Sequence, residues 1–108
     1  MKLLQQKQRA MNNTDKAVNM LGLAKRAGKL ICGEDMVLET IRSGKAKLVI
    51  IATDASDNTK KMFKDKCAYY NIPVCECAKK YDFNHASMAL SDTDFSGAIM
   101  NLLNVGGK

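Results

Sequence analysis

Four cysteines and one histidine are the residues of this sequence that could bind a metal or act as nucleophiles. Zinc sites pair ligands two to four residues apart and repeat the pair elsewhere, whereas here only Cys75 and Cys77 lie close together. Alternate residues of a strand share a face, so we predict buried thiols; a zinc or redox site is the alternative. His85 lies in a stretch without a catalytic signature, and no Cys–His nucleophile pair is predicted.

Asp54 is a further candidate, because it follows a central apolar strand, where α/β proteins collect ligands. A phosphoryl acceptor of the receiver-domain type would also need the pair of acidic residues that follows the first strand of that fold. This pair is absent here. Glu34 and Asp35 are better explained as acids at a helix N-terminus. The scattered glycines form no nucleotide cradle. We therefore predict no enzyme activity, metal, cofactor or small-molecule substrate.

The elements that must position these residues alternate between strand and helix. Apolar strands are predicted at residues 30–32, 48–52, 73–77 and around 88–90. Gly28 and Gly44 are predicted to end the first two helices, and Gly33 to turn the chain into the second. This alternation predicts an α/β fold, a three-layer α/β/α sandwich around a small four-stranded mixed sheet. Residues 14–108 would form one domain behind a polar extension at 1–13.

Helix caps and buried faces follow from the same patterns. One of residues 13–15 is predicted to cap the first helix, one of residues 56–58 the third, and Asp94 the last. The apolar faces are predicted to contain Met36, Val37, Thr40 and Ile41 in the second helix, and Thr59, Met62, Phe63, Cys67 and Tyr70 in the third. Residues 78–87 show no clear pattern.

The net charge of +6 is contributed entirely by the first 30 residues. Their basic residues are Lys2, Lys7, Arg9, Lys16, Lys25, Arg26 and Lys29, and their one acid is Asp15. Phosphate polymers are the commonest partners of such segments, so we expect a polyanion to approach this face; a solvated arm is the alternative. Lys60, Lys61 and Lys64 are expected to form a solvated helix face.

No segment predicts a membrane location. The longest apolar run, residues 48–52, is far shorter than the roughly 20 residues that cross a bilayer. The first residues lack the apolar stretch of roughly 7–15 residues that a signal peptide needs. We expect a cytoplasmic protein with reduced cysteines.

Five segments between residues 18 and 77 occur in a specific order and spacing. They are residues 21–30 (LGLAKRAGKL), 33–35 (GED), 41–52 (IRSGKAKLVIIA), 54–56 (DAS) and 65–70 (DKCAYY). Together they resemble the bacterial, ylxQ-type branch of the ribosomal protein L7Ae family. The resemblance implies an α/β/α sandwich that binds RNA, typically at kink-turns, and has no catalytic activity.

The resemblance also implies site residues. Kink-turn-binding members read Gly-Thr-Asn-Glu after the first strand, with a Lys three residues after the Glu. The matching residues here are Gly33, Glu34, Asp35, Met36 and Glu39, and only the glycine is retained. The lost amide, acceptor and lysine would have contacted guanine edges and phosphates, each good base contact contributing roughly 1–3 kcal/mol.

Residues 78–87 depart from the family as well, because they are shorter and lack its glycine-bearing loop, although Lys79 and Lys80 could reach phosphates. We predict a non-enzymatic RNA-binding protein associated with ribosomal or other structured RNA. Phosphate contacts are expected from Lys25, Arg26 and Lys29 beside the Gly33 turn, helped by Lys45 and Lys47. The alternative is a protein-interaction module on the same fold that has lost the RNA site. Met36, Glu39 and the altered residues 78–87 motivate it.

Overall fold

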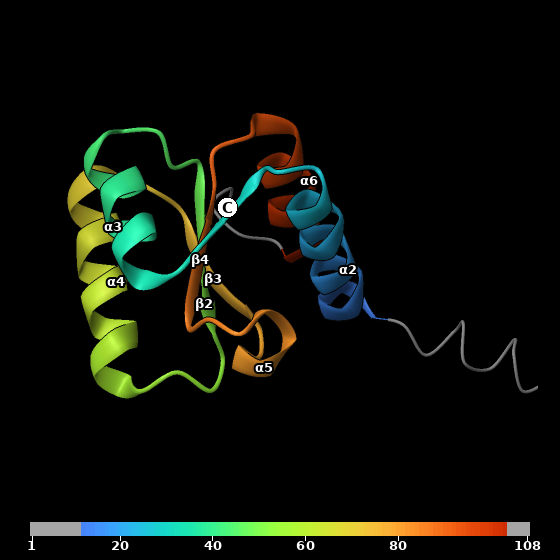
Figure 1. Ribbon diagram of the computed structural model, residues 1–108, viewed down its shortest axis with the longest axis horizontal. Coiled ribbons are helices and arrows are strands. Elements are labelled where there is room, and N and C mark those ends of the chain that lie inside the picture. Colours follow the sequence, from blue (N-terminus) through green and yellow to red (C-terminus); the bar gives the residue numbers. More distant parts are fainter. Residues whose placement is uncertain (1–11, 104–108) are drawn as a thin grey trace, which may run out of the picture.

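The computed structural model describes residues 12–103, without the side chains of Lys80 and Tyr81; most of the predicted extension therefore lies outside the described residues. A four-stranded mixed sheet lies between two helical layers, which confirms the predicted sandwich (Figure 1). The strands are β1 (Leu30–Cys32), β2 (Leu48–Ala52), β3 (Val74–Ala78) and β4 (Ser87–Leu90). The helices are α2 (Asn13–Arg26), α3 (Glu34–Arg42), α4 (Asp57–Tyr70), α5 (Lys80–Phe83) and α6 (Thr93–Leu103).

The sheet topology gives the molecule two distinct ends. The strand order is β1-β4-β2-β3, in which β4 is antiparallel to β1 and β2, and β2 is parallel to β3. The residues that follow β1, β2 and β3 therefore meet the residues that precede β4. We call this the Gly33 end (residues 33, 53–54, 79 and 84–86), and the opposite one the Lys47 end (residues 29, 45–47, 73 and 91–92).

The central strand β2 shows how the two layers share the sheet. All five of its residues are buried. Leu48 and Ile50 pack in the core that contains residues of α2 and α6, whereas Val49 and Ile51 pack in the core of α3 and α4. Figure 1 shows these helix pairs on opposite faces of the sheet. An apolar run without polar alternation is what a strand covered on both faces requires.

Helix caps correct two predictions. The Asn12 side chain, rather than one of residues 13–15, caps α2 by accepting the Asp15 N–H at 2.8 Å. Ser56 caps α4, as predicted. At α6 the prediction of Asp94 is wrong, because Asp92 accepts the Phe95 N–H at 2.9 Å. In each case the capping oxygen lies three residues before the amide it binds, outside the helical turn.

Two expected core residues are exposed. Met36 is 60% exposed in the first turn of α3, and Tyr70 is 37% exposed at the last residue of α4. Each of these two residues lies at a helix end. In α3, the partly buried Leu38 packs against the core and Met36 does not. The segment between β3 and β4 contains the short helix α5 and a left-handed residue, Asn84 (φ 64°). Strand β3 begins one residue later than predicted. None of the described helices is long and apolar enough to cross a membrane.

Candidate nucleic-acid interface

The turn predicted at Gly33 joins β1 to α3 and lies against the loop that precedes β4. Gly33 has φ 100° and ψ 142°, which side chains disfavour, and its carbonyl accepts the Val37 N–H at 2.9 Å to begin the helix. Its own N–H donates to the Ser87 carbonyl at 3.3 Å. A Cβ on Gly33 would lie 3.9 Å from the His85 imidazole, so the turn packs directly on this loop.

A hollow of about 560 Å³ opens where the turn, the segment after β2 and this loop meet. It is lined by Gly33, Glu34, Asp54, Asn84, His85, Ala86 and Ser87. Small-ligand pockets span roughly 300–1,000 Å³, so the hollow has room for a ligand group. The Ser87 hydroxyl is buried and has no hydrogen-bond partner among the described residues. The hydroxyl has almost no accessible surface, so a ligand in the hollow would contact the other lining groups rather than this one.

Ser87, His85 and Asp54 are the residue types of a catalytic triad, but they do not form one. A nucleophilic hydroxyl must be hydrogen-bonded to its histidine base, and the Ser87 hydroxyl makes no hydrogen bond within the described part of the chain. No cysteine is among the residues that line the hollow. The arrangement can therefore hold a polar group but does not activate a nucleophile.

The N-terminus of α3 lies at the rim of the hollow, where its own acids offset the positive end of the helix dipole. Glu34 and Asp35 are exposed in the first turn. Glu39 lies one turn further on, with its Oε1 atom 3.2 Å from Nη2 of Arg42. The residues that the resemblance assigns to RNA thus lie in the Gly33 turn and the first two turns of α3, and Glu34 and Asp35 make the N-terminus of the helix acidic.

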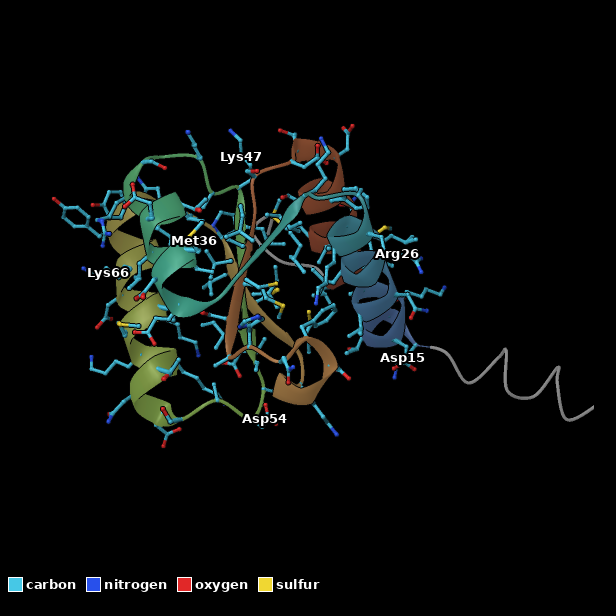
Figure 2. All side chains as sticks on the ribbon, in the orientation of Figure 1. Asp15, Arg26, Met36, Lys47, Asp54 and Lys66 are labelled. Atoms are coloured by element: carbon cyan, nitrogen blue, oxygen red, sulfur yellow. The ribbon has the colours of Figure 1, made fainter. Side chains whose placement is uncertain are left out.

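Three of the predicted basic residues lie at the other end of the sheet. Lys29 precedes β1, and Lys45 and Lys47 precede β2; the Lys47 N–H donates to the Leu90 carbonyl at the close of β4, at 2.7 Å. The prediction that Lys29 lies beside the Gly33 turn is therefore wrong, and Lys45 and Lys47 lie at the same far end as Lys29. A strand of three residues separates its ends by about 10 Å. Figure 2 shows Lys47 at one end of the sheet and Asp54 at the other.

Lys25 and Arg26 are in the last turn of α2, and both lie near Phe83 of α5. The Lys25 ammonium lies 5.9 Å from the centre of the Phe83 ring in α5. It is also close enough to Cys32 to oppose the rise that burial causes in the pKa of that thiol. Arg26 contributes to a separate surface hollow of about 450 Å³, between α2 and α5. Lys25 therefore lies near both α5 and Cys32, the residue before Gly33.

Lys79 belongs to the Gly33 end, because β3 finishes beside β2. The Thr53 N–H donates to the Ala78 carbonyl at 2.7 Å, and Lys79 follows directly, with its N–H bonded to Asp82 at 3.0 Å. Lys79 is exposed; Lys80 begins α5, and its side chain lies outside what the structure describes. The acidic rim thus has Lys25 and Lys79 in its surroundings.

The cysteines are free thiols, and Cys67, Cys75 and Cys77 are buried. Burial raises the pKa of Cys67 to about 11. A hydrogen bond with Cys77 and burial raise the pKa of Cys75. No group of three or more potential metal ligands occurs among residues 12–103. The interpretation as buried thiols therefore holds for the β3 pair, and Cys32 is only partly buried.

Thiol labelling is expected to separate Cys32 from the other three cysteines. The reagent must reach the thiolate, so burial slows the modification of Cys67, Cys75 and Cys77, whereas Cys32 is only partly buried. In the native protein near neutral pH, a maleimide is expected to modify Cys32 first, and all four thiols only after denaturation. Mass spectrometry of the labelled protein checks this, with and without a chelator. Rapid native labelling of two or more thiols, or a count that the chelator changes, would contradict it.

The lysines of α4 are paired with carboxylates. Lys60 and Lys64 place their Nζ atoms 3.3 and 2.8 Å from the two carboxylate oxygens of Glu76 in β3. Lys61 pairs with Asp65 at 3.2 Å. The hydrogen bond from Lys64 is the largest cause that lowers the pKa of Glu76. This face therefore joins α4 to the edge strand β3 rather than offering free positive charge.

Replacing Glu76 by glutamine is expected to lower the free energy of unfolding at neutral pH by about 1 kcal/mol, since partly exposed ion pairs contribute little more. The pKa of Glu76 in the folded protein lies below its ordinary value. The stabilisation by the carboxylate is therefore complete above the ordinary pKa and is lost as the pH falls through the folded pKa. Urea denaturation of both proteins from pH 7 down to pH 3 measures the difference, which should vanish in acid. A difference that grew in acid would contradict the pairing.

Sequence reasoning did not include Asn84, His85 and Ser87 among the binding residues, although they line the hollow. The available signal was topological. An antiparallel strand that begins near residue 87 must start where β1 ends, because Cys32 pairs with Met88. The segment just before it then has to lie against Gly33.

Comparison with known proteins agrees with this arrangement. The family model of the ribosomal protein L7Ae/L30e/S12e/Gadd45 family matches residues 15–88. An Enterococcus faecium protein named RNA-binding protein YlxQ is 56% identical over 64 residues, which are 59% of this chain and 62% of that protein, less than two thirds of its length. A Bacillus subtilis protein of the same name is 37% identical over 91 residues, which are 78% of this chain and 91% of that protein.

A solved structure of a Bacillus halodurans protein of unknown function has the same fold. It superposes with a TM-score of 0.77 at 32% identity, over 82% of this chain and 97% of that one. The family model spans both the Gly33 turn and the loop before β4. The chain belongs to the ribosomal protein L7Ae/L30e/S12e/Gadd45 family.

Proposed function

We propose that this protein is a non-catalytic RNA-binding protein that holds structured RNA of the kink-turn type at the Gly33 end, ribosomal RNA included. An unpaired nucleobase would enter the hollow and contact the Gly33 turn and the loop before β4. The observation that carries the proposal is the hollow between the Gly33 turn and the loop before β4, which has room for such a base. The names of the two YlxQ relatives support the choice of RNA as the ligand.

The charge around the hollow bears on how such RNA would be held. Lys25 and Lys79 can reach phosphates that flank a base in the hollow, and Lys80 follows in sequence. Glu34 and Asp35 oppose phosphate at the α3 N-terminus itself. We therefore infer binding through the flanking lysines and the base, with a weak contribution from the helix dipole.

A gel-shift titration tests the proposal. Three RNAs are compared: a kink-turn, the same RNA with the kink disrupted, and a plain duplex of equal length. The kink-turn is expected to bind tightest, because it alone offers an unpaired base at a sharp bend. Equal affinity for the first two RNAs would overturn the assignment of the hollow, and binding to none at low salt would overturn the function.

The protein-interaction alternative is favoured by one observation, the 60% exposed Met36 beside the acids of α3. Such a surface fits a protein partner better than a phosphate backbone. A pull-down with and without ribonuclease separates the two functions, since RNA-dependent capture is lost on digestion. Cosedimentation with ribosomal particles under the same two conditions tests the ribosomal part of the proposal.

A further inference from the structure

The Lys47 end of the sheet carries a second concentration of positive charge, on the side away from the hollow. We propose that it is a second RNA-binding surface, formed by Lys45, Lys47, Lys66 and Tyr69, which holds a duplex or single-stranded segment while the Gly33 end is occupied. We call these four residues the Lys47 surface. It goes beyond the function proposed above, because a protein with one site per end can bridge two RNA segments.

The loop that carries Lys45 and Lys47 is fixed by its backbone. The Lys45 N–H donates to the Thr40 carbonyl at 3.1 Å, which closes the end of α3, and Gly44 before it has φ 78°. Ala46, between the two lysines, is 7% exposed and packs in the core of α3 and α4. Both lysines are exposed on either side of this anchor, so their positions are held while their ammonium groups stay in water.

These lysines are also not neutralised. Among the described residues, neither Lys45 nor Lys47 has a carboxylate within 4.0 Å, in contrast to the three paired lysines of α4. The acids nearby are engaged: Glu39 pairs with Arg42. A carboxylate oxygen of Asp92 lies 3.8 Å from Lys29 Nζ, and Asp92 also caps α6. Within the described part of the chain, Asp94 is the one acid of this end that makes no ion pair. Lys45 and Lys47 therefore keep their full charge for a polyanion.

An exposed aromatic ring lies at the same end. The last turn of α4 leads into β3, whose first residue Val74 pairs with Val49, and the Val49 N–H donates to the Pro73 carbonyl at 3.0 Å. Tyr69 in that turn is 80% exposed, with its ring held edge-on to Tyr70 at 4.9 Å between centres. Such a ring gains nothing from burial, and it offers a face on which a nucleobase can stack.

Lys66 connects the ring to the charge. It lines a hollow of about 430 Å³ on α4 together with Met62, Asp65, Tyr69 and Tyr70. Asp65 in this hollow is paired with Lys61 rather than with Lys66. Figure 2 shows Lys66 on α4 and Lys47 at the end of the sheet beyond it. Lysines around an open, shallow surface fit the backbone of a polymer better than a small anion, which needs an enclosing site.

The charge distribution favours this end for the first encounter with RNA. At the Gly33 end, Glu34 and Asp35 of α3 offset the charge of Lys25 and Lys79, so this end attracts phosphate less strongly. Unpaired lysines at the other end supply the long-range attraction that raises association rates. The acidic hollow then selects by shape, and the Lys47 surface contributes affinity without sequence preference.

A pair of double variants tests the lysines on a plain RNA duplex. Lys45→Gln with Lys47→Gln is compared with Lys16→Gln and Arg26→Gln, which removes the same charge from exposed sites of α2. The first pair is expected to weaken duplex binding at low salt at least about tenfold, and to lower the salt slope by about 0.9 for each phosphate that the protein no longer neutralises. Unchanged duplex affinity, or an equal loss of affinity in both double variants, would overturn the proposal. An acidic protein would then be the better candidate partner for the Lys47 surface.

Tyr69 is tested on single-stranded RNA. Tyr69→Ala is expected to weaken binding several-fold and Tyr69→Phe to retain it, because stacking needs the ring and not the hydroxyl. Thermal unfolding of both variants should match the parent protein, since the residue is 80% exposed. If Tyr69→Ala bound single-stranded RNA with wild-type affinity, Tyr69 would not be part of the RNA-binding surface.

Simultaneous occupancy is the remaining test. The parent protein, bound to immobilised kink-turn RNA, is expected to capture a labelled duplex, whereas the Lys45/Lys47 double variant should bind the kink-turn and capture none. Undiminished capture by that variant would overturn the proposal. The duplex titration stands even if kink-turn binding fails, so the two proposals can fail separately.

Discussion

Replacing Gly33 by alanine is expected to lower the free energy of unfolding by about 1–3 kcal/mol and to weaken kink-turn binding, because φ 100° with ψ 142° is nearly confined to glycine. The strain comes from the backbone: the added Cβ would meet His85 at 3.9 Å, an ordinary contact distance. Relief of that strain would move the turn away from Ser87 and open the hollow. Urea denaturation and RNA titration of Gly33→Ala measure the two effects.

Gly22 supplies the matched control for this change. It lies inside α2, where a Cβ would meet no atom within 4 Å. Gly22→Ala is therefore expected to raise the free energy of unfolding by up to about 1 kcal/mol, from helix propensity alone, and to leave RNA affinity unchanged. If the two alanine variants shifted stability in the same direction, the turn at Gly33 would not be strained and the account of the site would fail.

The fold could be predicted because its strongest signals are local. The unbroken apolar run at 48–52 is a strand buried on both faces, and Gly28, Gly33 and Gly44 all adopt the positive φ that their positions at turns indicated. The weakest region, residues 78–87, contains the four-residue helix α5. A helix of one turn leaves no periodic apolar pattern, so sequence alone could not reveal it.

The candidate site was only partly predictable, for a geometric reason. Lys29 and Gly33 are four residues apart, which suggested one basic patch beside the turn. The intervening strand is extended and carries the chain about 3.3 Å per residue from one end of the sheet to the other. Lys25 comes earlier in sequence but reaches back along α2 toward Phe83. Charge counted along a sequence does not show which end of a sheet receives it.

The acids in the first turn of α3 oppose phosphate, so replacing one of them is expected to raise the affinity for RNA. Restoring the family's residues at two positions, Asp35→Asn and Glu39→Lys, removes an acid from the α3 N-terminus and supplies a cation one turn away. The amide and the lysine can then donate to guanine edges and phosphates, each contact contributing roughly 1–3 kcal/mol. We expect at least about tenfold tighter binding to kink-turn RNA, measured by fluorescence anisotropy, with little change for a plain duplex.

A control of equal charge separates recognition from general attraction. Asp65→Lys with Asp94→Asn also raises the net charge by three, and Asp94 likewise lies in the first turn of a helix, α6, but away from the Gly33 end. This variant adds its charge at the Lys47 end, so it is expected to tighten duplex binding at least as much as kink-turn binding. The ratio of the two affinities should therefore rise only for Asp35→Asn with Glu39→Lys. An unchanged ratio would mean that the α3 N-terminus does not touch the RNA, and the hollow would lose its closest flanking contact.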